Sequence, residues 1–216
     1  MYSNREEAGG LLAEKLAKYK NDKDAVIVTI PRGGVPIGYV IAKQLNLPLE
    51  IVLSKKIGHP FHKEFAIGAV TLKNIILSPV AADVPKVYIE KETERIRDLL
   101  RDRNKNYYSG KTPLSLYDKI VILVDDGVAT GNTLISCIEL IEQQNPSQIV
   151  VALPVAPLSA IQKIEEMHSV KQSICLLTPE NFHSVGQFYE DFSQVNDAEV
   201  IKLLKEANDN YLLMSI

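Results

Sequence analysis

The chain passes from a strand-like run to a helical pattern within the segment Val121-Ile-Leu-Val-Asp-Asp-Gly-Val-Ala-Thr-Gly-Asn-Thr133. Its first four residues are valine, isoleucine or leucine, which is typical of a buried strand. Asp125 and Asp126 follow, and Gly127 and Gly131 then permit a tight turn. Ligands of open α/β sheets bind beyond the carboxyl ends of the strands, so we expect this segment at a binding edge.

The turn after the two aspartates suits a phosphate group. Its small residues let successive backbone N–H groups face one ligand, and the N-terminus of the following helix adds partial positive charge. Thr130 and Thr133 add hydroxyl donors. Asp125 and Asp126 are suited to hydrogen-bonding vicinal hydroxyls or to holding Mg²⁺, directly or through water. The alternative is an acidic turn without a ligand, but adjacent buried carboxylates repel one another.

Strand-like and helical runs alternate along the rest of the chain. This alternation predicts an α/β fold in a single domain, residues 1–216, with a mainly parallel central sheet flanked by helices. The expected strands cover residues 25–30, 49–53, 119–124, 148–153 and 173–177. The expected helices cover residues 6–19, 36–45, 134–141 and 198–207.

Two regions interrupt the alternation. Residues 54–77 are expected to form an exposed loop, which ends near Glu64, and then an antiparallel hairpin that turns at Lys73. Residues 86–108 are expected to form an amphipathic helical insertion, because apolar residues recur there at about heptad spacing while acids and bases interleave. This insertion is a candidate for a lid or for the contact of a homodimer.

The composition indicates a soluble globular protein. Hydrophobic residues make up 46% of the chain, and the net charge of -3 predicts neither nucleic acid nor an anionic membrane as partner. Cys137 and Cys175 have no spacing of a disulfide framework or zinc site, so we expect two core cysteines. The sequence contains neither an apolar leader nor a run of about 20 apolar residues, which predicts a cytoplasmic location.

The segment 121–133 resembles the motif with which type I phosphoribosyltransferases bind phosphoribosyl pyrophosphate (PRPP). The resemblance implies their Rossmann-like fold, with PRPP as ligand and Mg²⁺ as cofactor. In that family the paired acids contact the ribose 2′- and 3′-hydroxyls and the turn holds the 5′-phosphate. The implied PRPP ligands are Asp125, Asp126, Gly127, Val128, Ala129, Thr130, Gly131, Asn132 and Thr133. Asp125 and Asp126 are also the implied catalytic residues and the ligands of Mg²⁺, directly or through water.

A second match follows the first expected strand, in Thr29-Ile-Pro-Arg-Gly-Gly-Val-Pro36. In the family this position forms the pyrophosphate loop, which implies that Arg32, Gly33 and Gly34 bind PRPP through a cation and closely approaching amides. A Gly-Gly pair before a helix is often only turn chemistry, so this interpretation depends on the segment 121–133.

Type I enzymes also commonly close a flexible loop, often with a basic residue, over the leaving pyrophosphate. Lys55 or Lys56 fits this catalytic role by position. His59 and His62 lie in the same expected loop, where histidines are more often solvated than catalytic.

The order of these motifs looks like that of a bacterial subgroup of predicted phosphoribosyltransferases whose substrate is unassigned. Hypoxanthine-guanine-type enzymes carry a carboxylate before the Thr-Gly pair, and Ala129 at this position disfavours that specificity. A hood over the acceptor is expected within residues 178–196. Phe182, Tyr189 and Phe192 are candidates there for a stacking wall, although such aromatics more often pack under their own loop.

The resemblance implies a pentosyltransferase that moves the phosphoribosyl group of PRPP to an unidentified nucleobase-like or small nitrogenous acceptor and releases pyrophosphate. Mg²⁺ and the Arg32 loop would stabilise the departing charge. A non-catalytic regulator that senses PRPP or a nucleotide is the main alternative. A phosphohydrolase is a further one, because paired aspartates can bind a catalytic metal.

Overall fold

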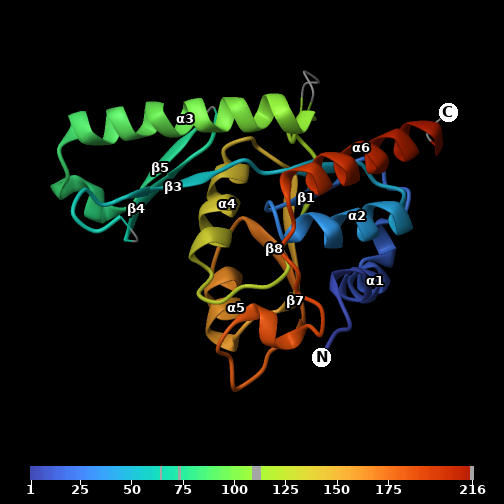
Figure 1. The fold of residues 1–216 in the computed structure, drawn as a ribbon. Coiled ribbons are helices and arrows are strands. Elements are labelled where there is room, and N and C mark those ends of the chain that lie inside the picture. Colours follow the sequence, from blue (N-terminus) through green and yellow to red (C-terminus); the bar gives the residue numbers. More distant parts are fainter. Residues whose placement is uncertain (64, 73, 109–112, 215–216) are drawn as a thin grey trace.

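The computed structural model of the chain describes residues 1–63, 65–72, 74–108 and 113–214. Glu64 and Lys73, which belong to the predicted loop and hairpin, lie outside the described residues. The main sheet has five parallel strands in the order β2-β1-β6-β7-β8, which confirms the predicted α/β architecture (Figure 1). Their bounds are β1 Ala25–Thr29, β2 Leu49–Ile51, β6 Ile120–Val124, β7 Gln148–Val155 and β8 Val170–Leu177.

Strands β1 and β6 lie side by side near the middle of this sheet. Their residues are β-branched or otherwise apolar and are almost all buried, as expected for strands covered on both faces. The register pairs Ala25 with Ile120 and Thr29 with Val124, so both strands end at the same level. The chain segments that follow them therefore emerge together at one edge of the sheet.

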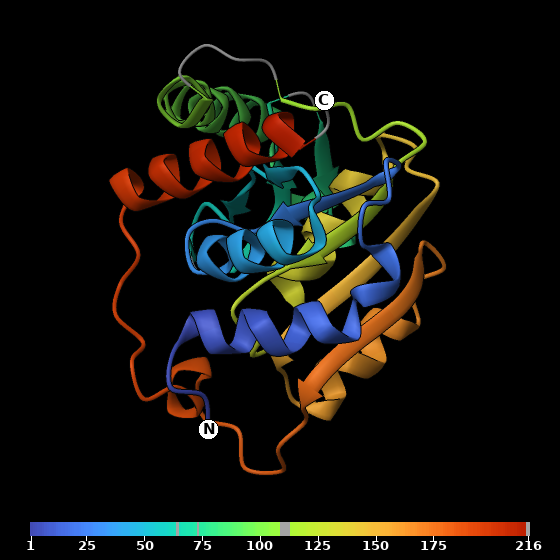
Figure 2. The same cartoon turned by 90° about the vertical axis from the view of Figure 1, so that its right-hand side faces the viewer.

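Helices cover the sheet on both faces (Figure 2). One core cluster contains Leu12, Ile37 and Leu204 of α1, α2 and α6, and the other contains Ile138 and Ile161 of α4 and α5. The helices are α1 Arg5–Lys15, α2 Gly34–Leu45, α4 Asn132–Glu142, α5 Leu158–Glu165 and α6 Asp197–Met214. Short 3₁₀ turns cover Ala17–Tyr19, Pro79–Asp83 and Val185–Phe188. The sequence patterns did not predict α5, which has only eight residues.

A second, three-stranded sheet projects from the main body as an arm (Figure 1). Its antiparallel strands are β3 Lys55–Gly58, β4 Ala66–Val70 and β5 Ile75–Leu77, and helix α3, Lys86–Tyr108, runs along it. The hairpin and the helical insertion are therefore confirmed. The loop expected over residues 55–64 was wrong at its start, because Ile57 of β3 is buried in the same core cluster as Ile96 of α3.

Cys137 is buried in the core as predicted, whereas Cys175 is only half-buried, and both are free thiols. None of the helices in the described part of the chain is long and apolar enough to cross a lipid bilayer.

A buried carboxyl links α3 to the edge of the main sheet. Glu50, on edge strand β2, accepts hydrogen bonds from the Tyr108 hydroxyl and from the Leu114 N–H, the latter at 3.0 Å. Burial raises the pKa of Glu50 above its ordinary value of 4.5, and the two hydrogen bonds oppose that rise only in part.

We expect Glu50→Gln to flatten the pH dependence of the unfolding free energy. Glu50 binds its proton more tightly in the folded chain, so the contribution is fully present below the unfolded pKa and is lost as pH rises through the folded pKa. Above about pH 4.5 the wild type should lose stability relative to the variant, by on the order of 1 kcal/mol. Urea denaturation at several pH values measures this difference, and parallel profiles would contradict the expectation.

Candidate functional site

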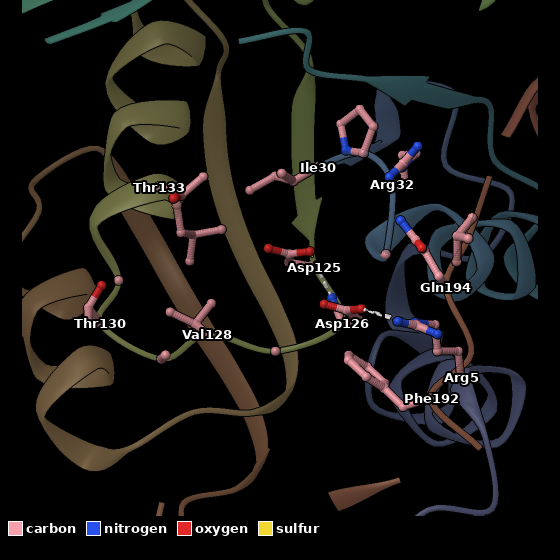
Figure 3. Close-up of a pocket in the computed structure, with 17 residues that line it drawn as sticks. Arg5, Ile30, Arg32, Asp125, Asp126, Val128, Thr130, Thr133, Phe192 and Gln194 are labelled. Carbon is pink, nitrogen blue, oxygen red and sulfur yellow. Dashed lines mark hydrogen bonds and ion pairs between the residues drawn. The ribbon is translucent and has the colours of Figure 1, made fainter. Parts of the chain in front are cut away.

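The candidate site lies where the helices after β1 and β6 leave the sheet on opposite faces. Helix α2 follows β1 on one face and α4 follows β6 on the other, and the crevice between such strands is the usual ligand position in open α/β sheets. A cavity of about 590 Å³ opens there (Figure 3). Its lining comes from the loop after β1, the turn after β6 with the start of α4, Arg5, and Phe192, Gln194 and Val195.

The turn after β6 forms one wall of the cavity. Gly131 has φ 85° and precedes α4, whose first N–H groups have no partner within the helix. Thr130 and Thr133 line the cavity, and Figure 3 shows their side chains on this wall. The N–H of Val128 is already bonded to the Val155 carbonyl at 3.1 Å, so Val128 contributes its side chain rather than a donor. The wall therefore fits the predicted phosphate cradle from Ala129 onward.

Asp125 and Asp126 line the cavity between the turn after β6 and the loop after β1. Asp125 Oδ1 accepts a hydrogen bond from the backbone N–H of Asp126 at 2.9 Å. Burial and the neighbouring Asp126 carboxylate raise the pKa of Asp125 well above its ordinary value. Burial also raises the pKa of Asp126, although the Arg5 guanidinium opposes this rise. A pair of adjacent buried carboxylates is favoured when a cation or hydrogen-bond donors contact it.

The loop after β1 packs directly against the aspartates. A Cβ atom on Gly33 would lie 2.0 Å from Asp126 Oδ2, and one on Gly34 would lie 2.9 Å from the Val124 carbonyl oxygen. Only glycine allows the two segments to approach this closely. Arg32 lines the cavity, and its Nη1 lies 3.6 Å from Asp197 Oδ1 of α6. The peptide bond between Pro31 and Arg32 is cis.

Of the predicted PRPP ligands, all but Gly34 and Asn132 line the cavity. Gly34 begins α2 and Asn132 begins α4, so both flank the lining. Lys55 and Lys56 lie on β3 of the arm and do not line this cavity.

The aromatic residues of the expected hood have different surroundings. The Tyr189 side chain is buried, and its hydroxyl donates to the backbone carbonyl of Asp126 at 2.6 Å. Tyr189 therefore holds the backbone of the aspartate turn. Phe182 packs against Phe188, with ring centroids 5.4 Å apart, and does not line the cavity. Phe192 does line it (Figure 3). The stacking role therefore stays a prediction for Phe192.

Six residues that line the cavity were not among the predicted site residues, namely Arg5, Ile30, Pro31, Leu134, Gln194 and Val195. Arg5 is the most consequential, because its Nε and Nη2 atoms donate to Asp126 Oδ2 at 3.0 and 2.8 Å. Its partner is 121 residues away in the chain, so no local pattern around Arg5 indicates the contact.

Comparison with known proteins agrees with this geometry. Residues 2–193 match the family model described as phosphoribosyl transferase domain. The chain belongs to the phosphoribosyl transferase family. The fold is therefore the type I phosphoribosyltransferase fold that the motif implied, in a family whose enzymes are pentosyltransferases.

Named relatives of this phosphoribosyl transferase family support the assignment. A presumed phosphoribosyl transferase of Mycobacterium tuberculosis is 30% identical over 217 residues, or 98% of this chain. The alignment covers 48% of that protein, so the chain spans about half the length of the curated relative it matches. A uracil phosphoribosyltransferase of Mycoplasma genitalium is 40% identical over 63 residues, which cover 29% of this chain and 30% of that protein.

A solved structure resembles nearly the whole phosphoribosyl transferase chain. The crystal structure of TT1426 from Thermus thermophilus superimposes with a TM-score of 0.83 at 36% sequence identity. The superposition covers 95% of this chain and 98% of that chain, so the arm and the main body both belong to the shared fold.

Proposed function

We propose that this protein binds PRPP together with Mg²⁺ and transfers the phosphoribosyl group to a nitrogenous acceptor, with release of pyrophosphate. One observation carries the proposal. Asp125 and Asp126 lie in a single cavity between the phosphate-type turn after β6 and the loop of Arg32 and Gly33. A ligand with a phosphate at one end, vicinal hydroxyls in the middle and a second anionic group at the other end suits this order of groups.

Each part of PRPP has a counterpart in the cavity under this proposal. The 5′-phosphate accepts hydrogen bonds from the turn that contains Thr130 and Thr133. The ribose hydroxyls donate to the carboxylates of Asp125 and Asp126. The pyrophosphate lies against Arg32 and the backbone of Gly33, where a guanidinium and closely approaching amides favour phosphate oxygens.

The two aspartates also fit Mg²⁺. The described residues contain no group of three or more potential metal ligands, so the site offers a pair of carboxylates. Mg²⁺ is commonly held by one or two carboxylates, with water and substrate phosphates completing its coordination. When bound, Mg²⁺ offsets the negative charge that develops on the departing pyrophosphate.

The chain's own residues then mainly position the reactants. The bond between the anomeric carbon and the pyrophosphate oxygen breaks, a bond from that carbon to the acceptor nitrogen forms, and the nitrogen loses a proton to solvent. The phosphate turn holds a part of the substrate that does not react, so its binding energy can orient the ribose. Arg32 contacts the leaving group, and closure of Lys55 or Lys56 over the pyrophosphate stays a prediction.

We expect calorimetry to detect PRPP binding that depends on Mg²⁺. Chelation with EDTA should weaken the affinity by at least about tenfold, because Mg²⁺ would no longer offset the charge on the pyrophosphate. ATP with Mg²⁺ is the matched control, since its ribose carries a 5′-triphosphate and not a 5-phosphate monoester. Absence of PRPP binding at millimolar concentration, with and without Mg²⁺, would contradict the proposed function.

The position of Lys55 and Lys56 outside the cavity lining favours a second candidate, a PRPP-sensing regulator without catalysis. Pyrophosphate release in the presence of PRPP and a panel of nucleobases and small amines separates the two candidates. Uracil belongs in the panel because a 63-residue stretch resembles a uracil phosphoribosyltransferase. Release with any acceptor supports the transferase, and tight binding without release across the panel supports the regulator.

A further inference from the structure

The first helix contributes a charged residue to the site. Arg5 begins α1, and its side chain is only 11% exposed. Nε and Nη2 both donate to Oδ2 of Asp126, at 3.0 and 2.8 Å, so one carboxylate oxygen receives two charge-assisted hydrogen bonds. Figure 3 shows the Arg5 side chain meeting Asp126 from the side opposite the phosphate turn.

The orientation of the Asp126 carboxylate is fixed by this contact. Oδ2 is enclosed between the Arg5 guanidinium and the α-carbon of Gly33, where even a methyl group would be 2.0 Å from it. Within the described part of the chain, no hydrogen bond from another residue reaches the second oxygen of this carboxylate, Asp126 Oδ1. The carboxylate therefore keeps one oxygen committed to the protein and the other available to a ligand in the cavity.

Arg5 is itself held by the C-terminal segment. Its Nη1 donates to the Ser193 carbonyl at 2.9 Å, and its Cζ lies 3.9 Å from the centroid of the Phe192 ring. That ring is stacked in turn on Tyr189, with centroids 5.1 Å apart. A guanidinium held by a carboxylate, a carbonyl and an aromatic face loses most of its conformational freedom before any ligand arrives.

The backbone around Arg5 is tied to the same segment. The Tyr2 N–H donates to the Phe188 carbonyl and the Glu190 N–H donates to the Tyr2 carbonyl, both at 2.8 Å. The Asn4 side chain caps α1 by accepting from the Glu7 N–H at 3.0 Å. The start of α1 and the hood segment therefore reach Asp126 as one unit.

We propose that Arg5 is a positioning residue, which presents Asp126 to the phosphoribosyl ligand and connects the hood to the ribose site. This proposal rests on the proposed function. It assigns Oδ1 of Asp126 to a ribose hydroxyl or to a water on Mg²⁺, and Oδ2 to Arg5 alone. The positive charge of Arg5 offsets the negative charge of the Asp126 carboxylate. The cation that binds with the ligand then has to offset the charge of the Asp125 carboxylate and not of both.

A double-mutant cycle on PRPP affinity tests the assignment. Calorimetry with PRPP and Mg²⁺ should give Arg5→Gln an affinity about 10- to 100-fold below the wild type, since charge-assisted hydrogen bonds of this kind are lost. Arg5→Lys, which keeps the charge and one donor, should recover part of that loss. In an Asp126→Asn background, Arg5→Gln should cost less than about threefold, because Arg5 acts through Asp126.

Arg101→Gln is the matched control, because it removes an exposed arginine of α3 that pairs with Glu94 and Asp98, remote from the cavity. Its affinity should equal that of the wild type. If Arg5→Gln unfolds, the cycle is run with Arg5→Lys, whose thermal denaturation and affinity are measured together.

The outcomes separate the two proposals. Wild-type protein that binds PRPP, with Arg5→Gln unchanged in affinity, would overturn the role of Arg5 and leave the proposed function intact. Equal losses from Arg5→Gln in the wild-type and Asp126→Asn backgrounds would also overturn it, since Arg5 would then only hold the hood in place. Failure of the wild type to bind PRPP would overturn the proposed function and this assignment with it.

Discussion

Gly33→Ala is expected to reduce PRPP affinity by about 100-fold or more while leaving the secondary structure unchanged. The added methyl group would lie 2.0 Å from Oδ2 and 2.6 Å from Cγ of Asp126, which is far inside contact distance. The carboxylate cannot rotate away cheaply, because Arg5 occupies its other side. The variant must therefore displace either Asp126 or the loop of Arg32, and both belong to the proposed site.

Gly10→Ala is the matched control for this change. Gly10 lies within α1, and its added Cβ would meet only the end of the Gln44 side chain, at 3.7 Å. This variant should bind PRPP normally and gain about 0.5 to 1 kcal/mol of stability, since alanine favours a helix over glycine. Circular dichroism and calorimetry on both variants make the comparison. A Gly33→Ala protein that binds PRPP within about threefold of the wild type would refute the close approach.

Asp125→Asn is expected to change stability and binding in opposite directions. The substitution removes a buried charge beside Asp126, and the asparagine oxygen can still accept from the Asp126 N–H. The free energy of unfolding should rise by about 1 kcal/mol, which corresponds to roughly 2 to 4 °C in melting temperature for a chain of this size. PRPP affinity should fall by about 10- to 100-fold, because a charged acceptor for the ligand is lost.

Differential scanning calorimetry and titration calorimetry of the same preparation measure both effects. Asp98→Asn is the matched control, because Asp98 is an exposed aspartate of α3 and should change neither quantity by much. If Asp125→Asn lowered stability and left PRPP affinity unchanged, Asp125 would have a structural role only.

The sequence predicted those parts of the cavity lining that are continuous in the chain. Gly33 and the turn from Asp125 to Thr133 were found because glycines, acids and hydroxyls there follow expected strands, and their chemistry is local. Phe192 was a candidate because it lies in the expected hood segment, whereas Arg5 reaches the cavity only through tertiary packing. Arg5 has no periodic or motif-like neighbourhood, so its role depended on the relative placement of α1 and the C-terminal segment.

The predicted fold was most accurate where the pattern of apolar residues is regular. Strands β1 and β6 are apolar almost throughout, the long helix α3 has an amphipathic pattern, and the structure confirms all three. The segment that begins at Lys55 was misread because its charged residues and glycine are typical of a loop. In the structure, pairing with β4 and the burial of Ile57 under α3 outweigh those local preferences.

The contacts of Arg5 also bear on the order in which the chain folds. Arg5 meets Asp126 across 121 residues and Ser193 across 188, so these contacts close long loops and are expected to form late in folding. We expect a partly folded chain that has only β1 and β6 in place to lack them. Ligand affinity would then report completed folding, and a ligand that binds only the native state would slow proteolysis and protect the whole chain rather than one half of it.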